Sequence, residues 1–139
     1  MSAQHESALP GERNGDPRLL SGFRFDVRSL PGDIRVVTLV GEIDLLFLAR
    51  LQAVLLDELT APARAVILDL TRVDFLAAGA VGVLAGAQRR AAARRIELHL
   101  VGAQRMVHRV FELTGLTGLL PCHPTVPDAL RLLDPTGQA

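Results

Sequence analysis

The chain has 139 residues, of which 49% are hydrophobic, and its 15 basic and 15 acidic side chains cancel. This length supports one domain with a hydrophobic core, and the composition argues against a disordered chain or a nucleic-acid binder that depends on overall charge. The single cysteine excludes an intramolecular disulfide, residues 1–16 lack the pattern of a signal peptide, and the longest apolar run, residues 75–87, is too short to cross a bilayer. We therefore expect one cytoplasmic domain without membrane insertion.

The first two predicted elements form a hairpin. In FRFDVRSL, residues 23–30, apolar and charged side chains alternate, which is typical of a strand with one buried face. The turn sequence PGD, residues 31–33, leads into a second strand, IRVVTLVG, at residues 34–41. We expect these strands to pair in antiparallel fashion.

A helix and a buried strand follow. The motif Gly41-Glu42-Ile43-Asp44 is expected to end the second strand and lead into LLFLARLQAVLLDELT, residues 45–60, where leucines recur at helical spacing. The run AVILDL, residues 65–70, is almost wholly apolar, as in a central strand that is covered on both faces.

The stretch FLAAGAVGVL, residues 75–84, predicts a strand that ends at Leu76 and turns directly into a helix of small residues. Such a turn leaves the first helix amides unpaired and pointing to solvent. Gly79, Gly82 and Gly86 do not match the glycine spacing of a dinucleotide-binding loop, so we expect no nucleotide cofactor. Ala78, Gly82 and Gly86 recur every four residues, which favours close packing of this helix on the sheet.

The rest of the chain continues the alternation of strands and helices. A strand at residues 96–101, a helix in AQRMVHRVFELTGL, a short strand in LLPC and a last helix in VPDALRLL are expected. The inward side chains of the first of these helices are expected to be Met106, Val107, Val110, Phe111 and Leu113. The fold class is thus α/β, a single domain at residues 21–134 with an antiparallel hairpin, then parallel strands, and about four helices, between flexible tails at 1–20 and 135–139.

Three segments carry a family resemblance: LVGEIDLLFLARLQAVL, VILDLTRVDFLAAGAVGVLAGA and RMVHRVFELTGLTGLL. In this order and at these separations they resemble the signature segments of STAS domains, the fold of bacterial anti-sigma factor antagonists. The resemblance implies that the turn after the central strand is the regulatory site. In such antagonists, a serine there is phosphorylated by an anti-sigma factor that is also a kinase, and the unphosphorylated form binds this anti-sigma factor and frees the sigma factor.

The turn departs from the family pattern at its reactive position. The residues that match are Phe75, Leu76, Gly82, Val83 and Leu84. However, Ala77 stands where the family has Asp, and Ala78 stands at the position of the phospho-acceptor serine. A methyl group cannot accept phosphate, so the negative charge that would alter the helix start cannot be added at residue 78. We therefore expect a regulator without the usual phosphorylation switch, and not an enzyme.

The contact surface is expected where this turn meets the start of the preceding helix. Asp44 can cap that helix or touch a partner, and the apolar residues that follow it can form a contact surface or pack in the core. The expected partner-binding residues are Asp44, Leu45, Leu46, Phe47, Ala77, Ala78, Gly79 and Val81.

The expected partner is a kinase-like anti-sigma factor or another regulatory protein, and a homodimer stays open. The alternative is a STAS scaffold or ligand-sensing module of a signalling assembly or a membrane transporter.

Other chemistry-bearing residues give weaker patterns. The histidines His5, His99, His108 and His123 lack the paired spacing of metal ligands, and we expect Cys122 to be a small buried residue. The arginines in RRAAARR, residues 89–95, suit the end of a helix in solvent better than a nucleic-acid site. We expect no catalytic residue, metal or cofactor.

Overall fold

The fold of the computed structural model begins with a β-hairpin, and the structure describes residues 22–102, 105–115, 118 and 120–133. Strand β1 (Phe23–Leu30) pairs in antiparallel fashion with β2 (Ile34–Ile43). The turn between them places Gly32 and Asp33 at positive φ, of 87° and 61°, a conformation that glycine and aspartate tolerate better than most residues. The predicted hairpin is confirmed.

The remaining strands extend the hairpin into one mixed sheet. Strands β3 (Ala65–Leu76), β4 (Glu97–Val101) and β5 (Cys122–His123) follow in the order β1-β2-β3-β4-β5, and every pair after the first is parallel. A short 3-10 helix, η3 (Leu45–Phe47), precedes α2 (Leu48–Glu58), and α3 (Ala80–Ala93), α4 (Arg105–Thr114) and α5 (Val126–Leu133) complete the described elements. This is the predicted α/β domain with its mixed sheet and four α-helices.

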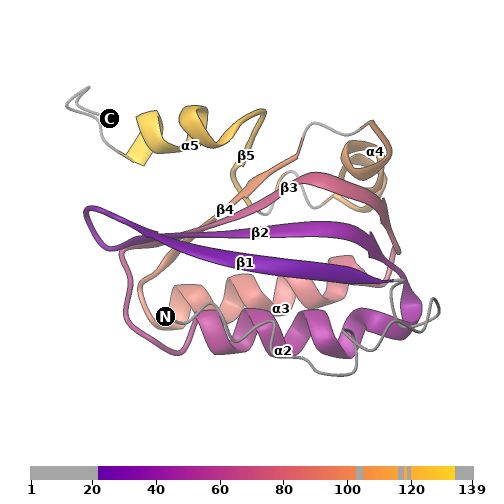
Figure 1. The fold of residues 1–139 in the computed structure, drawn as a ribbon, viewed down its shortest axis with the longest axis horizontal. Coiled ribbons are helices and arrows are strands. Elements are labelled where there is room, and N and C mark those ends of the chain that lie inside the picture. Colours follow the sequence, from indigo (N-terminus) through magenta and orange to yellow (C-terminus); the bar gives the residue numbers. More distant parts are fainter. Residues whose placement is uncertain (1–21, 103–104, 116–117, 119, 134–139) are drawn as a thin grey trace.

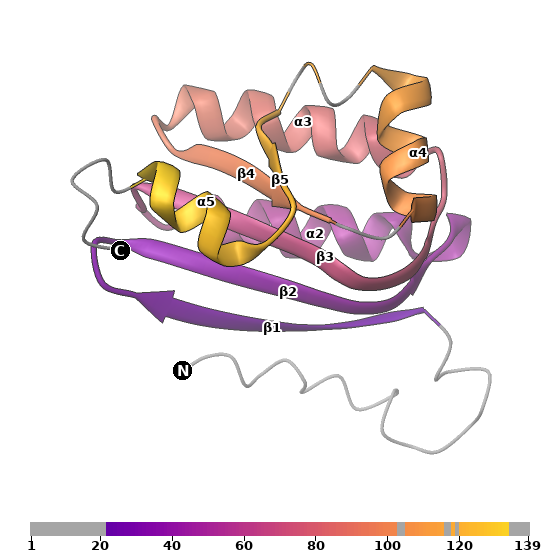
Figure 2. The same ribbon diagram turned by 90° about the horizontal axis from the view of Figure 1, so that it is seen from above.

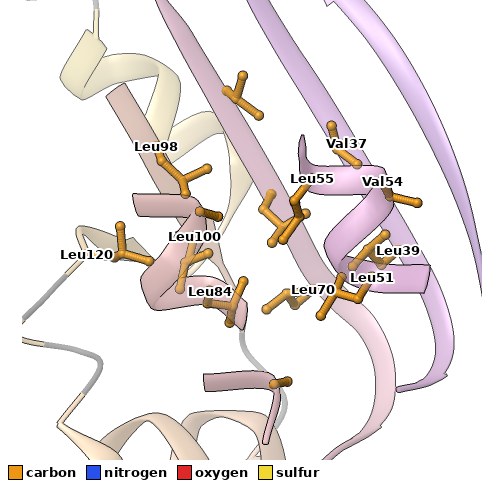
Figure 3. Close-up of a cluster of buried hydrophobic side chains, with 14 of the residues drawn as sticks. Val37, Leu39, Leu51, Val54, Leu55, Leu70, Leu84, Leu98, Leu100 and Leu120 are labelled. Carbon is orange, nitrogen blue, oxygen red and sulfur yellow. The ribbon is translucent and has the colours of Figure 1, made fainter. Parts of the chain in front are cut away.

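The helices lie on both sides of the sheet. In Figure 1, α2 and α3 cover one face and α5 lies over the other, while Figure 2 shows α4 across the end of β3. The larger core lies between the sheet and the α2–α3 layer and contains the leucine and valine side chains of Figure 3. A smaller core packs Ala129 and Leu133 of α5 against Val36 and Ile67. Strand β3 contributes side chains to both cores, which explains its almost unbroken apolar sequence.

Strand β2 is longer than the sequence suggested, because Gly41 lies in an irregularity within the strand and does not end it. Its φ is +118°, and the pairing of β2 with β3 shifts between Thr38 and Val40 and again between Gly41 and Glu42. A Cβ atom on Gly41 would collide with the carbonyl oxygen of Gly22, which accepts a 2.7 Å hydrogen bond from the Glu42 amide. The prediction that this motif ends the strand is therefore wrong, and β2 continues to Ile43.

Two predictions of burial are also wrong. Leu113 of α4 is 76% exposed, whereas Phe111 is buried, because residues two apart on a helix point in nearly opposite directions. Cys122, expected to be buried, is exposed on β5. The side chains of Met106 and Val107 lie outside the described residues.

The proposed tails, residues 1–20 and 135–139, also lie outside the described residues, so these boundaries stay predictions. Within the described part of the chain, no helix combines the length and hydropathy needed to cross a membrane.

Candidate functional site

The candidate site forms where two neighbouring parallel strands end. Strands β2 and β3 run side by side as far as Ile43 and Leu76, and the amide of Ala77 donates a 2.8 Å hydrogen bond to the carbonyl oxygen of Ile43. A helical turn begins directly after each strand, so residues 44–48 and 77–81 lie next to each other. We call these two segments the helix-tip surface. The structure thus brings together the two segments in which the sequence predicted partner-binding residues.

In the first segment, Asp44 caps the chain that follows it. Its Oδ1 atom accepts a 3.0 Å hydrogen bond from the amide of Leu46. Leu45 and Leu46 are 73% and 85% exposed, which is unusual for large apolar side chains. Phe47 is half-buried and packs against the larger core, with its ring 2.7 Å from the position that a Cβ on Gly22 would occupy. The two leucines therefore face solvent, whereas the phenylalanine is part of the packing.

In the second segment, Ala78 and Gly79 are exposed, and Ala77 is half-buried. Val81 is half-buried and packs against the larger core. Gly79 is the N-cap of α3, and no side chain caps this helix. A Cβ atom on Gly79 would lie 2.8 Å from Cδ1 of Leu48, so the absence of a side chain lets the two segments approach closely. Ala78 therefore lies at an accessible helix tip, beside the start of α2.

The amides at this tip are less available than the sequence suggested. The amides of Ala80, Val81 and Gly82 donate to the carbonyl oxygens three residues earlier, at 2.9, 3.0 and 3.2 Å. An ordinary helix start leaves these amides unpaired, but this tight first turn pairs them. The prediction that the first amides of the helix are unpaired is therefore wrong. Among the described residues, the amides of Ala78 and Gly79 have no hydrogen-bond partner.

The helix-tip surface consists mainly of apolar side chains and backbone. Asp44 is the one ionisable side chain in residues 44–48 and 77–81, so these segments bring together no nucleophile with a base. In the described part of the chain, no three histidine, cysteine or acidic side chains gather into a set that could hold a metal ion. The exposed groups are apolar side chains and a short stretch of backbone, which suit contact with another protein.

A pair of histidines lies elsewhere, on β4 and β5. His99 is buried, and its Nδ1 and Nε2 atoms lie 2.9 Å from Nε2 of His123 and 3.1 Å from Oε1 of Glu97. An ionised carboxylate only accepts, so Nε2 of His99 donates to Glu97, and in the neutral pair Nε2 of His123 donates to Nδ1 of His99. Burial and the neighbouring His99 lower the pKa of His123, against the opposing effect of Asp128. The 24-residue separation hid this pair from sequence reasoning.

A groove between α2 and α3 was also missed. Gly82 is exposed, and a Cβ atom there would meet nothing within 4 Å, so the prediction that Gly82 and Gly86 allow close packing on the sheet is wrong. Both glycines instead line a groove of about 450 Å³. The groove residues are Gln52, Leu55, Leu56, Gly82, Val83, Gly86, Ala87, Arg89 and Arg90.

Comparison with known proteins assigns the family. Residues 25–129 match the STAS domain, and the chain belongs to this family. Over 71 residues it is 42% identical to Rv2638 of Mycobacterium tuberculosis, a candidate anti-anti-sigma factor, and 38% identical to the anti-sigma-F factor antagonist RsfA of the same species. These matches cover 51% of this chain, 47% of Rv2638 and 55% of RsfA. The chain thus matches about half the length of these curated relatives.

A solved structure agrees with the family over a longer stretch. The crystal structure of an anti-sigma factor antagonist from Mycobacterium paratuberculosis is similar, with a TM-score of 0.74 and 26% sequence identity. The similarity covers 80% of this chain and 93% of that one. The protein is therefore a STAS domain protein similar to anti-sigma factor antagonists.

Proposed function

We propose that the protein is an anti-sigma factor antagonist that binds a kinase-like anti-sigma factor through its helix-tip surface and is not switched off by phosphorylation at residue 78. The observation that carries the proposal is the exposure of Leu45, Leu46 and Ala78 where two helix starts meet. Exposed large apolar side chains beside an accessible backbone favour a protein partner. Because sigma factors act on RNA polymerase inside the cell, the protein would work in the cytoplasm.

The missing hydroxyl at residue 78 determines how the proposed complex would be regulated. Phosphate on a side chain at residue 78 would add up to two negative charges to the helix-tip surface, and would weaken an apolar contact there by desolvation. The Ala78 methyl group cannot receive that phosphate. The complex would then be controlled by the amounts of the two proteins and not by the kinase activity of the partner.

The first experiment measures binding and phosphate transfer. Each kinase-like anti-sigma factor of the source organism is purified and mixed with the full chain, with and without its sigma factor and labelled ATP. We expect at least one to bind, to release its sigma factor, and to leave no label on the protein. Failure of all of them to bind overturns the proposal, as does labelling at another residue that dissociates the complex.

A second experiment locates the contact with matched variants. Leu45→Ser/Leu46→Ser removes the exposed leucines of the helix-tip surface, and Leu113→Ser/Leu132→Ser removes two leucines that are 76% and 61% exposed on α4 and α5. Because all four side chains face solvent, both double variants should fold. We expect the first to weaken binding by at least about tenfold and the second to change it by less than about twofold. Equal effects would mean that the contact lies elsewhere.

A further inference from the structure

The groove between α2 and α3 is a second surface without an assigned role. Its volume of about 450 Å³ lies within the roughly 300–1,000 Å³ of typical ligand pockets. Its apolar walls are the half-buried side chains of Leu56 and Val83, and the buried Leu55 and Ala87 lie beneath them. Gln52 lines the groove and is exposed, as are Gly82 and both arginines, so the groove opens to solvent.

The charged side chains that line the groove are both positive. These two residues, Arg89 and Arg90, are both exposed. An Nη atom of Arg89 lies 3.7 Å from the position that a Cβ on Gly86 would occupy, which places this guanidinium over the groove. In the described part of the chain, neither guanidinium group has an ion-pair or hydrogen-bond partner. Two available guanidinium groups beside an apolar lining favour an occupant with carboxylates and apolar side chains.

We propose that this groove binds an acidic amphipathic helix of the anti-sigma factor, with its apolar side chains between α2 and α3 and its carboxylates on Arg89 and Arg90. This inference rests on the proposed function. Gly82 and Val83 directly follow the helix-tip surface along α3, so a partner that covers residues 77–81 already lies next to the groove. An amphipathic helix is the common occupant of an apolar groove between helices.

Charge disfavours a second copy of this chain as the occupant. Two copies related by a two-fold axis through the groove would bring Arg89 and Arg90 of one copy near the same arginines of the other. Like charges that meet in this way oppose association, whereas an acidic helix neutralises them. The apolar lining also disfavours nucleic acid, whose phosphates would gain nothing from Leu56 and Val83.

The first test uses the anti-sigma factor that binds the full chain. Arg89→Glu/Arg90→Glu reverses the charge of the groove, and Arg24→Glu/Arg28→Glu makes the same charge change at exposed positions of β1. We expect the groove variant to weaken binding by at least about tenfold and the β1 variant to change it by less than about threefold. Equal losses would indicate long-range charge effects alone and would overturn the proposal.

The second test fills the groove. Gly86→Leu places a large side chain in it, whereas Ala92→Leu places the same side chain at an exposed position of α3 that does not line the groove. The Gly86 variant should bind at least about tenfold more weakly and the Ala92 variant about as well as the unchanged protein. Circular dichroism spectra that match the unchanged protein show that both variants are folded. Tight binding by Gly86→Leu would overturn the proposal.

The third test identifies the occupant. A photo-crosslinker is attached to Gln52→Cys in the full chain with Cys122→Ser, and the purified anti-sigma factor is added. We expect a cross-link to a helix of the partner that carries Asp or Glu. A cross-link to residues 1–20 of this chain, to a second copy, or to a segment without acidic residues would overturn the proposal.

The outcomes separate the two proposals. If no anti-sigma factor binds, both are wrong. If Leu45→Ser/Leu46→Ser weakens binding while every groove variant binds normally, the proposed function stands and the groove has no part in it.

Discussion

Leu48 and Gly79 meet where the two halves of the helix-tip surface adjoin, because Cδ1 of Leu48 lies 2.8 Å from where a Cβ atom on Gly79 would be. Gly79 has a φ of −63°, which any residue can adopt, so a side chain here is opposed by the position of Leu48 and not by backbone conformation. The contact joins the start of α2 to the start of α3 across the ends of β2 and β3. A change at either residue should therefore disturb both halves.

We predict that Gly79→Ala lowers the free energy of unfolding by about 1 kcal/mol, because the new methyl group must displace the end of the Leu48 side chain. Urea denaturation measures this loss. Leu48→Ala should remove the conflict, so the double variant should be more stable than the sum of the two single changes predicts. Strict additivity of the two changes would show that the contact is not strained by the methyl group.

The opposite result is expected for Gly82→Ala, one turn along the same helix. Nothing lies within 4 Å of its Cβ position, and the residue is in the helical part of α3. Replacing an interior helical glycine by alanine stabilises a helix by up to about 1 kcal/mol. We expect the midpoint of urea denaturation to rise. A fall in the midpoint would mean that the position needs glycine for a reason beyond space.

Restoring the hydroxyl should restore a switch. We predict that Ala78→Ser is phosphorylated by the kinase-like anti-sigma factor that binds the protein, and that the phosphorylated form binds it at least about tenfold more weakly. Mass spectrometry locates the phosphate, and a pull-down with and without ATP measures release. Ala92→Ser, an exposed position near the far end of α3, is the matched control and should stay unmodified. An unmodified Ala78→Ser protein would contradict the assignment of residue 78 to the acceptor position.

Stability should depend on the protonation of His123. The folded protein lowers the pKa of His123 from its ordinary value of 6.5, so the unfolded chain takes up the proton at higher pH than the folded one. The free energy of unfolding should therefore fall as the pH drops through about 6.5, and the fall should level off below the folded-state pKa. Urea denaturation at about pH 7.5 and 5.5 measures this loss.

His123→Gln is the matched variant for this pH effect, because its side-chain amide can still donate to Nδ1 of His99 but does not titrate. We expect a smaller loss of stability between the two pH values in the variant than in the unchanged protein. The same loss in both proteins would assign the pH dependence to other groups.

Patterns in the sequence predicted the elements well where burial sets a clear period. Alternation in β1 and the apolar run of β3 placed these strands correctly, because one buried face and two buried faces leave different patterns. Gly41 misled the prediction, since a glycine at positive φ in a strand irregularity and a glycine at a strand end look alike in sequence. The prediction that Leu113 points inward failed because an exposed leucine and a buried leucine look the same in a sequence.

The helix-tip surface could be located from the sequence but not described in detail. The residues before each helix start gave its position, whereas the exposure of Leu46 and the packing of Phe47 depend on neighbours such as Gly22 that are distant in sequence. The groove and the His99–His123 pair could not be predicted at all. Both form between elements whose relative placement is set by packing. A small residue such as Gly82 does not indicate whether its side of the helix faces the sheet or the solvent.

The irregular pairing of β2 with β3 has a consequence for the distance between the two helix starts. Ile34 lies opposite Ala65, but Ile43 lies opposite Leu76, so β3 takes two more residues than β2 to reach the same level. This even offset keeps Ile43 and Leu76 pointing into the same core and makes the strands finish together. The site is therefore aligned by the backbone of the sheet, and its exposed side chains can be exchanged for others without moving its two halves apart.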